Sequence, residues 1–456
     1  MDCAVCWQEP YCFTLLISLR FLKERVAIQN CDSQEGQLAH RTLDQTVSIG
    51  HRSATQSMAE KEMANADRWL LPEGVEEILP DEAFALESLR RRVLDIYASW
   101  GYQLVITPFV EFLDSLLIGT SHDLDLQTFK VTDQLSGRMM GIRADMTPQV
   151  ARIDAHSLNR QGPARLCYAD SVLHTLPRGL LTSRVPIRLG AEFFGHAGPE
   201  ADIELICLML RTLQEAQVNN VHLVLGHVGI FRTLVDIAGL DESTEQALFS
   251  ALQRKVYEEI DQILEQSVNE SNIRDMLYQL SRLSGDEEIL DRAMEKFASA
   301  PEQVQRELHD LQAIATGVRK KLPTATLGFD LCELRGYKYH TGIVFAAYTP
   351  DYGRAVAKGG RYDHIGEVFG RARPASGFDC DLKVLATLSH TGVCRKPGIL
   401  APDKSDTELA EVVENLRQSG EVVIVNFGVD LDIAKSELNC DRQLVKKQNS
   451  WLVEQL

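Results

Sequence analysis

The apolar run from Gly342 to Tyr348 constrains the fold most, because β-branched and aromatic residues behind a glycine-containing turn predict a buried strand. Further short strand signals occur along the chain, at 103–107, 129–133, 139–144, 164–175, 187–195, 221–225, 325–331 and 375–378. Several of them are joined by short returns, with the helical segments set apart. This arrangement favours an antiparallel sheet flanked by helices, in the α+β class.

Helical patterns fill most of the remaining chain. Pro80 and Asp81 predict the start of a helix that Gly101 ends, and Pro199 predicts the start of a second long helix. Residues 228–322 are almost entirely helical in pattern, with alternating charges and no strand signal. We interpret this stretch as an inserted set of solvated helices without chemistry of their own.

These patterns divide the chain into four parts. We expect a core at 63–227 and 323–392, the helical insertion at 228–322, and a small C-terminal α/β unit at 393–456. Residues 1–62 are expected to be a disordered or non-native extension, because the stretch 32–57 is polar and lacks an apolar period.

Composition excludes several classes of function. The formal net charge of -18 argues against a nucleic-acid binder, because the phosphate backbone attracts positive charge. No apolar run reaches the roughly 18 to 20 residues that a membrane span needs. Ten cysteines, six of them scattered singly, indicate a reducing compartment. Cys3 and Cys6 lack a second ligand pair, so we expect no metal site and no cofactor.

The turn before the apolar run is a candidate binding site. Arg335 could hold a carboxylate through two parallel hydrogen bonds, and Tyr337, Tyr339 and His340 could line a flat pocket. The alternative is an arginine that caps a sheet edge beside tyrosines of the core. The residues alone leave both interpretations open.

Four motifs, in this order and spacing, resemble the catalytic core of histidyl-tRNA synthetases, which are class II aminoacyl-tRNA synthetases. The motifs are RADMTPQVAR at 143–152, RLGAEFFG at 188–195, ELRGYKYHTG at 333–342 and GGRYD at 359–363. The resemblance covers about residues 66 to 390 and implies a class II synthetase-like sheet with a helical insertion.

Three departures from the synthetase pattern fall where ATP would bind. His174 stands where those enzymes place an arginine, and Asp381 and Lys383 stand where a glycine followed by an arginine is usual. Lysine or histidine replaces a phosphate-binding arginine poorly, and an aspartate would repel the nucleotide. The large anticodon-binding domain is also too short or absent.

The chain therefore resembles the regulatory subunits of ATP phosphoribosyltransferase. This resemblance implies a non-catalytic cytoplasmic protein that self-associates into dimers and joins a short catalytic subunit in a hetero-octamer. It implies a role at the first step of histidine biosynthesis, with L-histidine as the feedback effector. The alternatives are a histidyl-tRNA synthetase or another synthetase-derived amino-acid-binding protein.

The resemblance also implies a histidine site. Asp145 and Thr147 would receive the amino group and Arg335 the carboxylate, and the imidazole would meet Glu192, Tyr337, Tyr339 and His340. Arg188 belongs to the same wall, where the family usually has glutamine.

Each of these residues also has an ordinary structural explanation. Asp145 could end a helix, Thr147 could be an N-cap and Glu192 could pair with Arg188. The two tyrosines could be core residues, and His340 a structural histidine. Arg361 of the last motif is expected to anchor the sheet.

Overall fold

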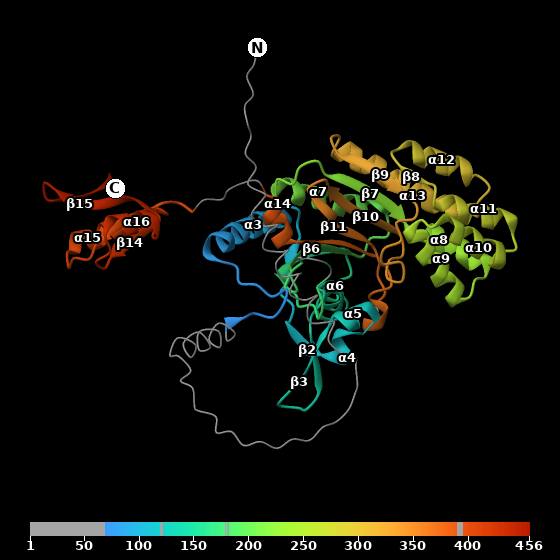
Figure 1. The fold of residues 1–456 in the computed structure, drawn as a ribbon, viewed down its shortest axis with the longest axis horizontal. Coiled ribbons are helices and arrows are strands. Elements are labelled where there is room, and N and C mark those ends of the chain that lie inside the picture. Colours follow the sequence, from blue (N-terminus) through green and yellow to red (C-terminus); the bar gives the residue numbers. More distant parts are fainter. Residues whose placement is uncertain (1–68, 119–121, 178, 180–181, 390–394) are drawn as a thin grey trace, which may run out of the picture. The chain divides into compact units, whose positions relative to one another are not determined.

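The structure is a computed structural model that describes residues 69–118, 122–177, 179, 182–389 and 395–456 (Figure 1). The chain divides into residues 1–70 and residues 71–456, and every element described below belongs to the second unit. The expected extension at 1–62, with Cys3 and Cys6, lies outside the described residues.

A nine-stranded sheet in the described residues forms the centre of the molecule. Its spatial order is β1 (Gln103–Leu104), β5 (Ala164–Ser171), β6 (Ile187–Phe194), β12 (Ala375–Asp381), β11 (Tyr352–Arg361), β10 (Ile343–Thr349), β7 (His222–His227), β9 (Thr326–Asp330) and β8 (Ser284–Gly285). The central strands from β5 to β7 are all antiparallel. Two outer pairs, β1 with β5 and β7 with β9, are parallel. The predicted α+β class is confirmed, with a sheet that is antiparallel at its centre and mixed towards its ends.

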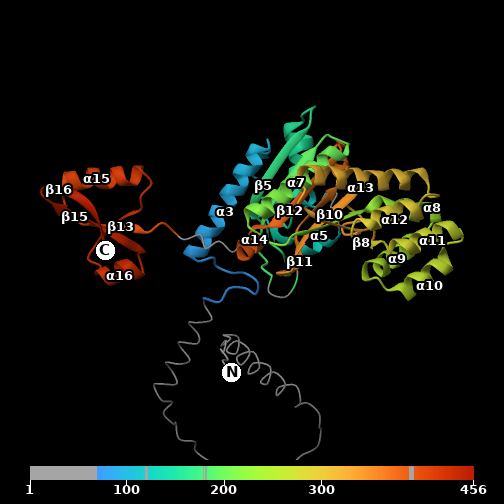
Figure 2. The same ribbon diagram turned by 90° about the horizontal axis from the view of Figure 1, so that it is seen from above.

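Four helices pack on one face of this sheet (Figure 2). They are α3 (Pro80–Ser99), α7 (Pro199–Glu215), α13 (Glu302–Lys321) and α14 (Leu382–Leu388). Proline begins α3 and α7 as predicted, but Leu79 is the N-cap of α3, and Asp81 lies inside its first turn. An acid there still favours the helix through the macrodipole.

The opposite face carries α6 (Thr147–Arg152), which continues as a π-helical turn (Ile153–Leu158). Alternation along β5 separates the two faces: Leu166 and Tyr168 join the apolar cluster below α6, whereas Cys167 and Ala169 join the main core.

Beyond α6 lie short elements that flank the site. They are α4 (Leu113–Leu116), α5 (His122–Gln127) and a small sheet of β2 (Val110–Phe112), β4 (Met139–Ile142) and β3 (Phe129–Thr132). The β3–β4 hairpin was predicted; β2 was not, because so short a strand shows no alternation.

Helices dominate the chain between β7 and β9. They are α8 (Val228–Ala238), α9 (Glu242–Arg254), α10 (Tyr257–Ser267), α11 (Ser271–Leu280), α12 (Glu288–Lys296) and α13. The prediction of no strand was wrong at β8, whose two residues pair with β9 and carry no periodic signal. None of the described helices is long and apolar enough to cross a lipid bilayer.

The C-terminal residues form a separate four-stranded sheet of order β14-β13-β15-β16. Its elements are β13 (Gly398–Pro402), α15 (Thr407–Gln418), β14 (Val423–Asn426), α16 (Leu431–Ser436), β15 (Cys440–Lys447) and β16 (Ser450–Gln455). The sequence predicted a small α/β unit here, at 393–456. In the core, β11 was not predicted, and a 3-10 turn (Glu367–Phe369) follows the GGRYD motif.

Candidate functional site

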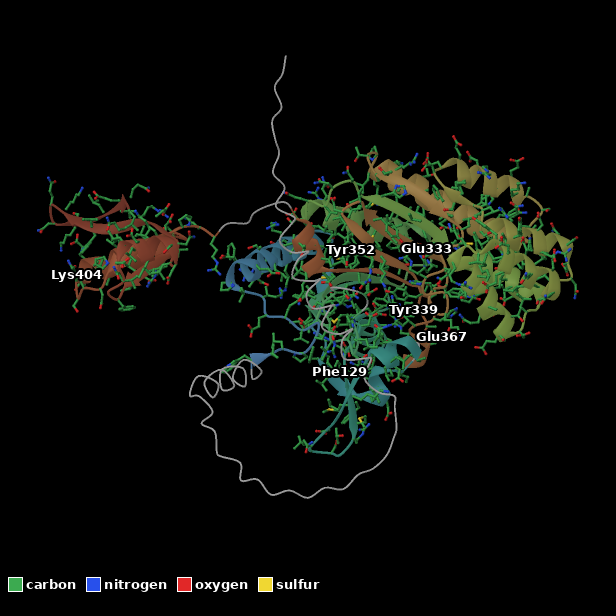
Figure 3. All side chains as sticks on the ribbon, in the orientation of Figure 1. Phe129, Glu333, Tyr339, Tyr352, Glu367 and Lys404 are labelled. Carbon is green, nitrogen blue, oxygen red and sulfur yellow. The ribbon has the colours of Figure 1, made fainter. Side chains whose placement is uncertain are left out.

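A cavity of about 270 Å³ lies on the face of β6, β10, β11 and β12 that α6 borders. The start of α6 and the loop 333–342, which we call the effector loop, form its remaining walls. Figure 3 labels Glu333 and Tyr339 of this loop. Six of the predicted site residues line the cavity: Asp145, Thr147, Glu192, Arg335, Tyr339 and His340.

Glu192 is the buried acid of the cavity, with 1% of its surface exposed. Its Oε1 accepts hydrogen bonds from Thr147 Oγ1 at 2.9 Å and from the Tyr168 hydroxyl at 3.1 Å. Its Oε2 has no protein partner and lies beside Gly377, where a Cβ would come within 1.6 Å of that oxygen. Burial raises the pKa of Glu192 well above its ordinary value, and the nearby Asp145 acts in the same direction. Burial therefore favours the neutral, protonated form of this side chain.

Aromatic rings form the wall next to Glu192. Tyr339 stacks on Tyr362 with ring centroids 5.0 Å apart, and His340 meets Tyr339 edge-on at 5.2 Å. The hydroxyls of Tyr339 and Tyr362 are buried without a hydrogen-bond partner. Burial lowers the pKa of His340 to about 4, so its imidazole is neutral near pH 7. The wall suits a flat polar group that can satisfy these oxygens.

Arg335 supplies a cation at the mouth of the cavity, but its guanidinium is already engaged. Its Nε donates to Glu333 Oε1 at 2.8 Å, and its Nη2 contacts Glu333 Oε2 and the Tyr348 hydroxyl. The bond to Glu333 raises the pKa of Arg335 further. A ligand carboxylate would therefore have to displace Glu333 from the arginine.

Two predicted residues do not line this cavity. Arg188 is buried and pairs with Asp379 at 2.8 Å, not with Glu192, and it lines a second cavity. Burial acts to lower the pKa of Arg188, but the charges of Asp379, Asp145 and Asp381 together outweigh it and the pKa is raised. Tyr337 packs between Phe231 and Phe249 of the insertion.

Several residues that line the cavity were not predicted from the sequence, among them Gln127, Glu333, Lys358, Tyr362 and Asp379. Tyr362 belongs to the GGRYD motif, and Glu333 is the first residue of the motif that contains Arg335, so the motifs could have identified both as site residues. No sequence pattern indicated Lys358 as a site residue, because its strand β11 was not predicted.

The second cavity, of about 450 Å³, shares Arg335, Lys358 and Asp379 with the first. His174 and Asp381, two of the residues that depart from the synthetase pattern, line it.

Each departing residue has a partner within the chain. A ring nitrogen of His174 lies 3.0 Å from the Ala144 carbonyl oxygen. Asp381 caps α14 by accepting from the Lys383 amide at 3.1 Å, and Lys383 Nζ pairs with Glu76 at 2.8 Å. All three residues thus serve the fold at this place.

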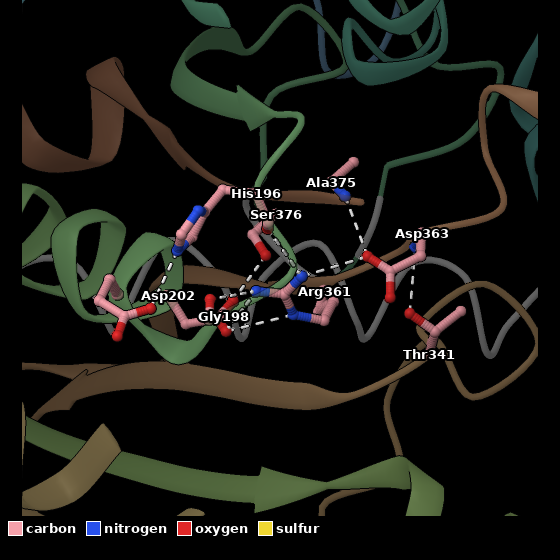
Figure 4. Close-up of polar contacts among 9 residues, drawn as sticks. His196, Gly198, Asp202, Thr341, Arg361, Asp363, Ala375 and Ser376 are labelled. Atoms are coloured by element: carbon pink, nitrogen blue, oxygen red, sulfur yellow. Dashed lines mark hydrogen bonds and ion pairs between the residues drawn. The ribbon is translucent and has the colours of Figure 1, made fainter. Parts of the chain in front are cut away.

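Arg361 of GGRYD stands apart from the cavity and anchors the sheet, as expected (Figure 4). Its Nη2 pairs with the buried Asp202 at 2.7 Å and donates to the Gly198 carbonyl at 3.0 Å. Ser376 on β12 donates to the other carboxylate oxygen of Asp202 at 2.5 Å. Within the part of the chain that the structure describes, no three His, Cys, Asp or Glu side chains gather in a group that could hold a metal ion.

Two family models match the chain. The model described as histidyl-tRNA synthetase covers residues 74–385, and the model described as ATP phosphoribosyltransferase subunit HisZ C-terminal domain covers residues 396–454. Together they span both the core and the C-terminal unit, and the second distinguishes the chain from a synthetase.

Curated relatives agree with the second model. The ATP phosphoribosyltransferase regulatory subunit of Chromohalobacter salexigens is 53% identical over 394 residues, which are 86% of this chain and 100% of the relative. The protein of the same name from Alkalilimnicola ehrlichii is 50% identical, with 88% of this chain and 100% of the relative covered.

Solved structures support the fold. A Bacillus halodurans protein described as an ATP phosphoribosyltransferase regulatory subunit/histidyl-tRNA synthetase matches with a TM-score of 0.71 and 27% identity, covering 81% of this chain and 96% of that chain. Histidyl-tRNA synthetase from Nostoc matches with a TM-score of 0.67 at 20% identity, covering 83% and 91%, and shows the shared fold alone. On these relatives and family models, the chain belongs to the family of ATP phosphoribosyltransferase regulatory subunits.

Proposed function

We propose that this chain is a non-catalytic sensor that binds L-histidine in the 270 Å³ cavity and thereby controls a short-form ATP phosphoribosyltransferase catalytic subunit. In this proposal the two proteins form a hetero-octamer in the cytoplasm, built on dimers of this chain. The predicted core, at 63–227 and 323–392, is the sensing part.

One observation carries the proposal: three buried oxygens without partners converge on the cavity. They are Glu192 Oε2 and the hydroxyls of Tyr339 and Tyr362. A buried polar group without a partner costs about 1–3 kcal/mol, so a ligand that supplies donors and acceptors here gains that energy on binding. An imidazole is flat, has one donor and one acceptor when neutral, and matches the stacked rings.

The charged groups at the cavity suit the rest of an amino acid. Asp145 and Thr147 face it from the start of α6, where an ammonium group would find an acid and a hydroxyl. Arg335 provides the cation for the carboxylate once Glu333 is displaced. The second cavity supports a sensor over a synthetase, because His174 lines it where the synthetase pattern has an ATP-binding arginine, and Asp381 adds a carboxylate that would repel the nucleotide.

Two variants at the mouth of the cavity should act in opposite directions. Arg335→Ala removes the carboxylate anchor and should weaken histidine binding about tenfold to a hundredfold, because a charge-assisted hydrogen bond contributes about 1.5–3 kcal/mol. Glu333→Gln removes the competing carboxylate and should tighten histidine binding. Titration calorimetry of the full chain measures both affinities.

The same variants test regulation in the complex with the catalytic subunit. Arg335→Ala should keep activation and lose inhibition by histidine, whereas Glu333→Gln should be inhibited at lower histidine concentration. Arg306→Ala is the control, because Arg306 forms an exposed pair with Glu302 on α13. Full histidine sensitivity of Arg335→Ala would contradict the site. Histidine-dependent ATP–pyrophosphate exchange by the pure chain would establish a synthetase instead.

A further inference from the structure

The effector loop is attached to the helical insertion by Arg232 of α8. Nη2 of Arg232 donates to the Tyr337 carbonyl at 2.7 Å and to the His340 carbonyl at 2.8 Å. These two carbonyls bracket Tyr339, the loop residue that stacks on Tyr362 in the cavity. One side chain of the insertion therefore fixes the loop backbone on both sides of a cavity residue.

Tyr337 makes a second attachment. Its ring lies between Phe231 of α8, at 5.2 Å, and Phe249 of α9, at 5.6 Å, and the Arg232 guanidinium lies 5.1 Å from the ring centroid. Only 8% of Tyr337 is exposed. Gly336, with φ of 68°, begins this turn, and a Cβ there would come within 2.5 Å of His340 Nδ1. The loop thus places Tyr337 among the helices and Tyr339 in the cavity.

The base of α8 is fixed to the sheet next to the same loop. The Val228 amide donates to the Gly342 carbonyl at 3.0 Å, where the effector loop enters β10. The first turn of α8 and the end of the loop therefore move together, and Arg232 one turn further on holds the middle of the loop.

We propose that Arg232 and Tyr337 are positioning residues that hold the effector loop and transmit its ligand-dependent movement to α8 and α9. The inference rests on the proposed function, because the movement begins when a ligand carboxylate takes Arg335 from Glu333. The helical insertion, which the sequence presented as solvated helices without a role, becomes the element that responds to an occupied cavity. Such an attachment couples the cavity to α8 and α9 only if the ligand and the helices both favour the same position of the effector loop.

Amide hydrogen exchange of the full chain, with and without histidine, tests the attachment. In the wild type, histidine should slow exchange in the effector loop and also in α8 and α9. In Arg232→Ala the loop should exchange faster without ligand, the response of α8 and α9 should disappear, and histidine should bind about tenfold more weakly. Arg232→Lys keeps a charged donor and should restore part of each effect.

Lys338→Ala is the matched control, because Lys338 lies in the same loop and its pair with Glu242 at the start of α9 is long, at 3.7 Å, and exposed, so it should contribute little. It should behave as the wild type in every measurement. The inference would be overturned if histidine slowed exchange in α8 and α9 of Arg232→Ala as much as in the wild type. It would also be overturned if the wild type bound histidine without any change of exchange in α8 and α9. If titration calorimetry detected no binding of histidine to the wild type, the proposed function would be overturned instead. The ligand-free exchange of Arg232→Ala would then still decide whether Arg232 positions the loop.

Discussion

A buried carboxylic acid in the cavity, with burial favouring its neutral form, is the central chemical feature at the residue scale. Glu192 has two hydroxyl donors on one oxygen and none on the other, and Asp145 nearby makes a second negative charge unfavourable. Because two hydroxyls already donate to Oε1, Oε2 is the oxygen left for a ligand. When protonated, Oε2 can donate to an imidazole nitrogen that carries no hydrogen, and when ionised it can accept from a ring N–H. The group can therefore adapt to either tautomer of an imidazole.

The protonation of Glu192 should appear in the pH dependence of stability. Its pKa is raised from 4.5 in the folded chain, so above about pH 4.5 the unfolded chain loses a proton that the folded chain keeps. The free energy of unfolding should then fall with rising pH, by up to about 1.4 kcal/mol per pH unit, until the raised pKa is passed. Glu192→Gln should lack this slope. Urea unfolding of both proteins at pH 6 and pH 8 measures it, and parallel slopes would contradict a neutral Glu192.

The order of residues along the effector loop shows what a motif can and cannot predict about a site. Glu192 and Tyr339 were predicted because their motifs keep the synthetase pattern, and both line the cavity. Tyr337 was assigned to the same wall because of the same resemblance. Residues 335–339 form a turn, in which Gly336 has a positive φ and Tyr337 packs against the insertion. The pairing of Arg335 with Glu333 also depends on the folded turn.

At the scale of elements, the buried pair of Arg361 and Asp202 joins the sheet to α7. Arg361 ends β11, Asp202 lies in the first turn of α7, and Ser376 of β12 completes the contact. Burial raises the pKa of Asp202, while the charge of Arg361 opposes that shift. The pair is thus costly to bury and costly to break.

Asp202→Asn should lower the free energy of unfolding by about 3–5 kcal/mol, because Arg361 would lose its buried counter-charge. Urea unfolding measures the change. Glu302→Gln, at an exposed pair on α13, is the control and should cost at most about 1 kcal/mol. A loss for Asp202→Asn no larger than the control would show that Arg361 contributes little to the joint.

Long helices were predictable and short strands were not, for a physical reason. Helices α3 and α7 contain enough turns to show an apolar stripe, and proline marks where each begins. Strand β11 contains glycines and charged residues, and its register comes from β10 and β12 on either side. Such a strand depends on its neighbours in the sheet, which a local pattern cannot reveal.

At the scale of the whole molecule, the core and the C-terminal unit have separate apolar interiors. One cluster of the C-terminal unit contains Ile399, Leu409 and Trp451, and no residue of the core contributes to it. No residue of 395–456 lines the candidate cavity. Sensing and the C-terminal unit should therefore be separable.

A chain that ends at Ser389 should keep its histidine affinity within about twofold, a change well below 1 kcal/mol. Titration calorimetry measures the affinity, and circular dichroism checks that the core is folded. Loss of binding in a folded truncated chain would show that the C-terminal unit contributes to the site.

The helical insertion is also the connection between the parallel strands β7 and β9. Two parallel neighbours cannot be joined by a tight turn, and they need a crossover of a dozen residues or more. The segment from α8 to α13 is that crossover, and α13 returns along α7 and β7 to enter β9. The sheet requires some connection here but does not specify its length. Changes in the length of α10–α12 are therefore compatible with the topology of the sheet as long as α13 still enters β9.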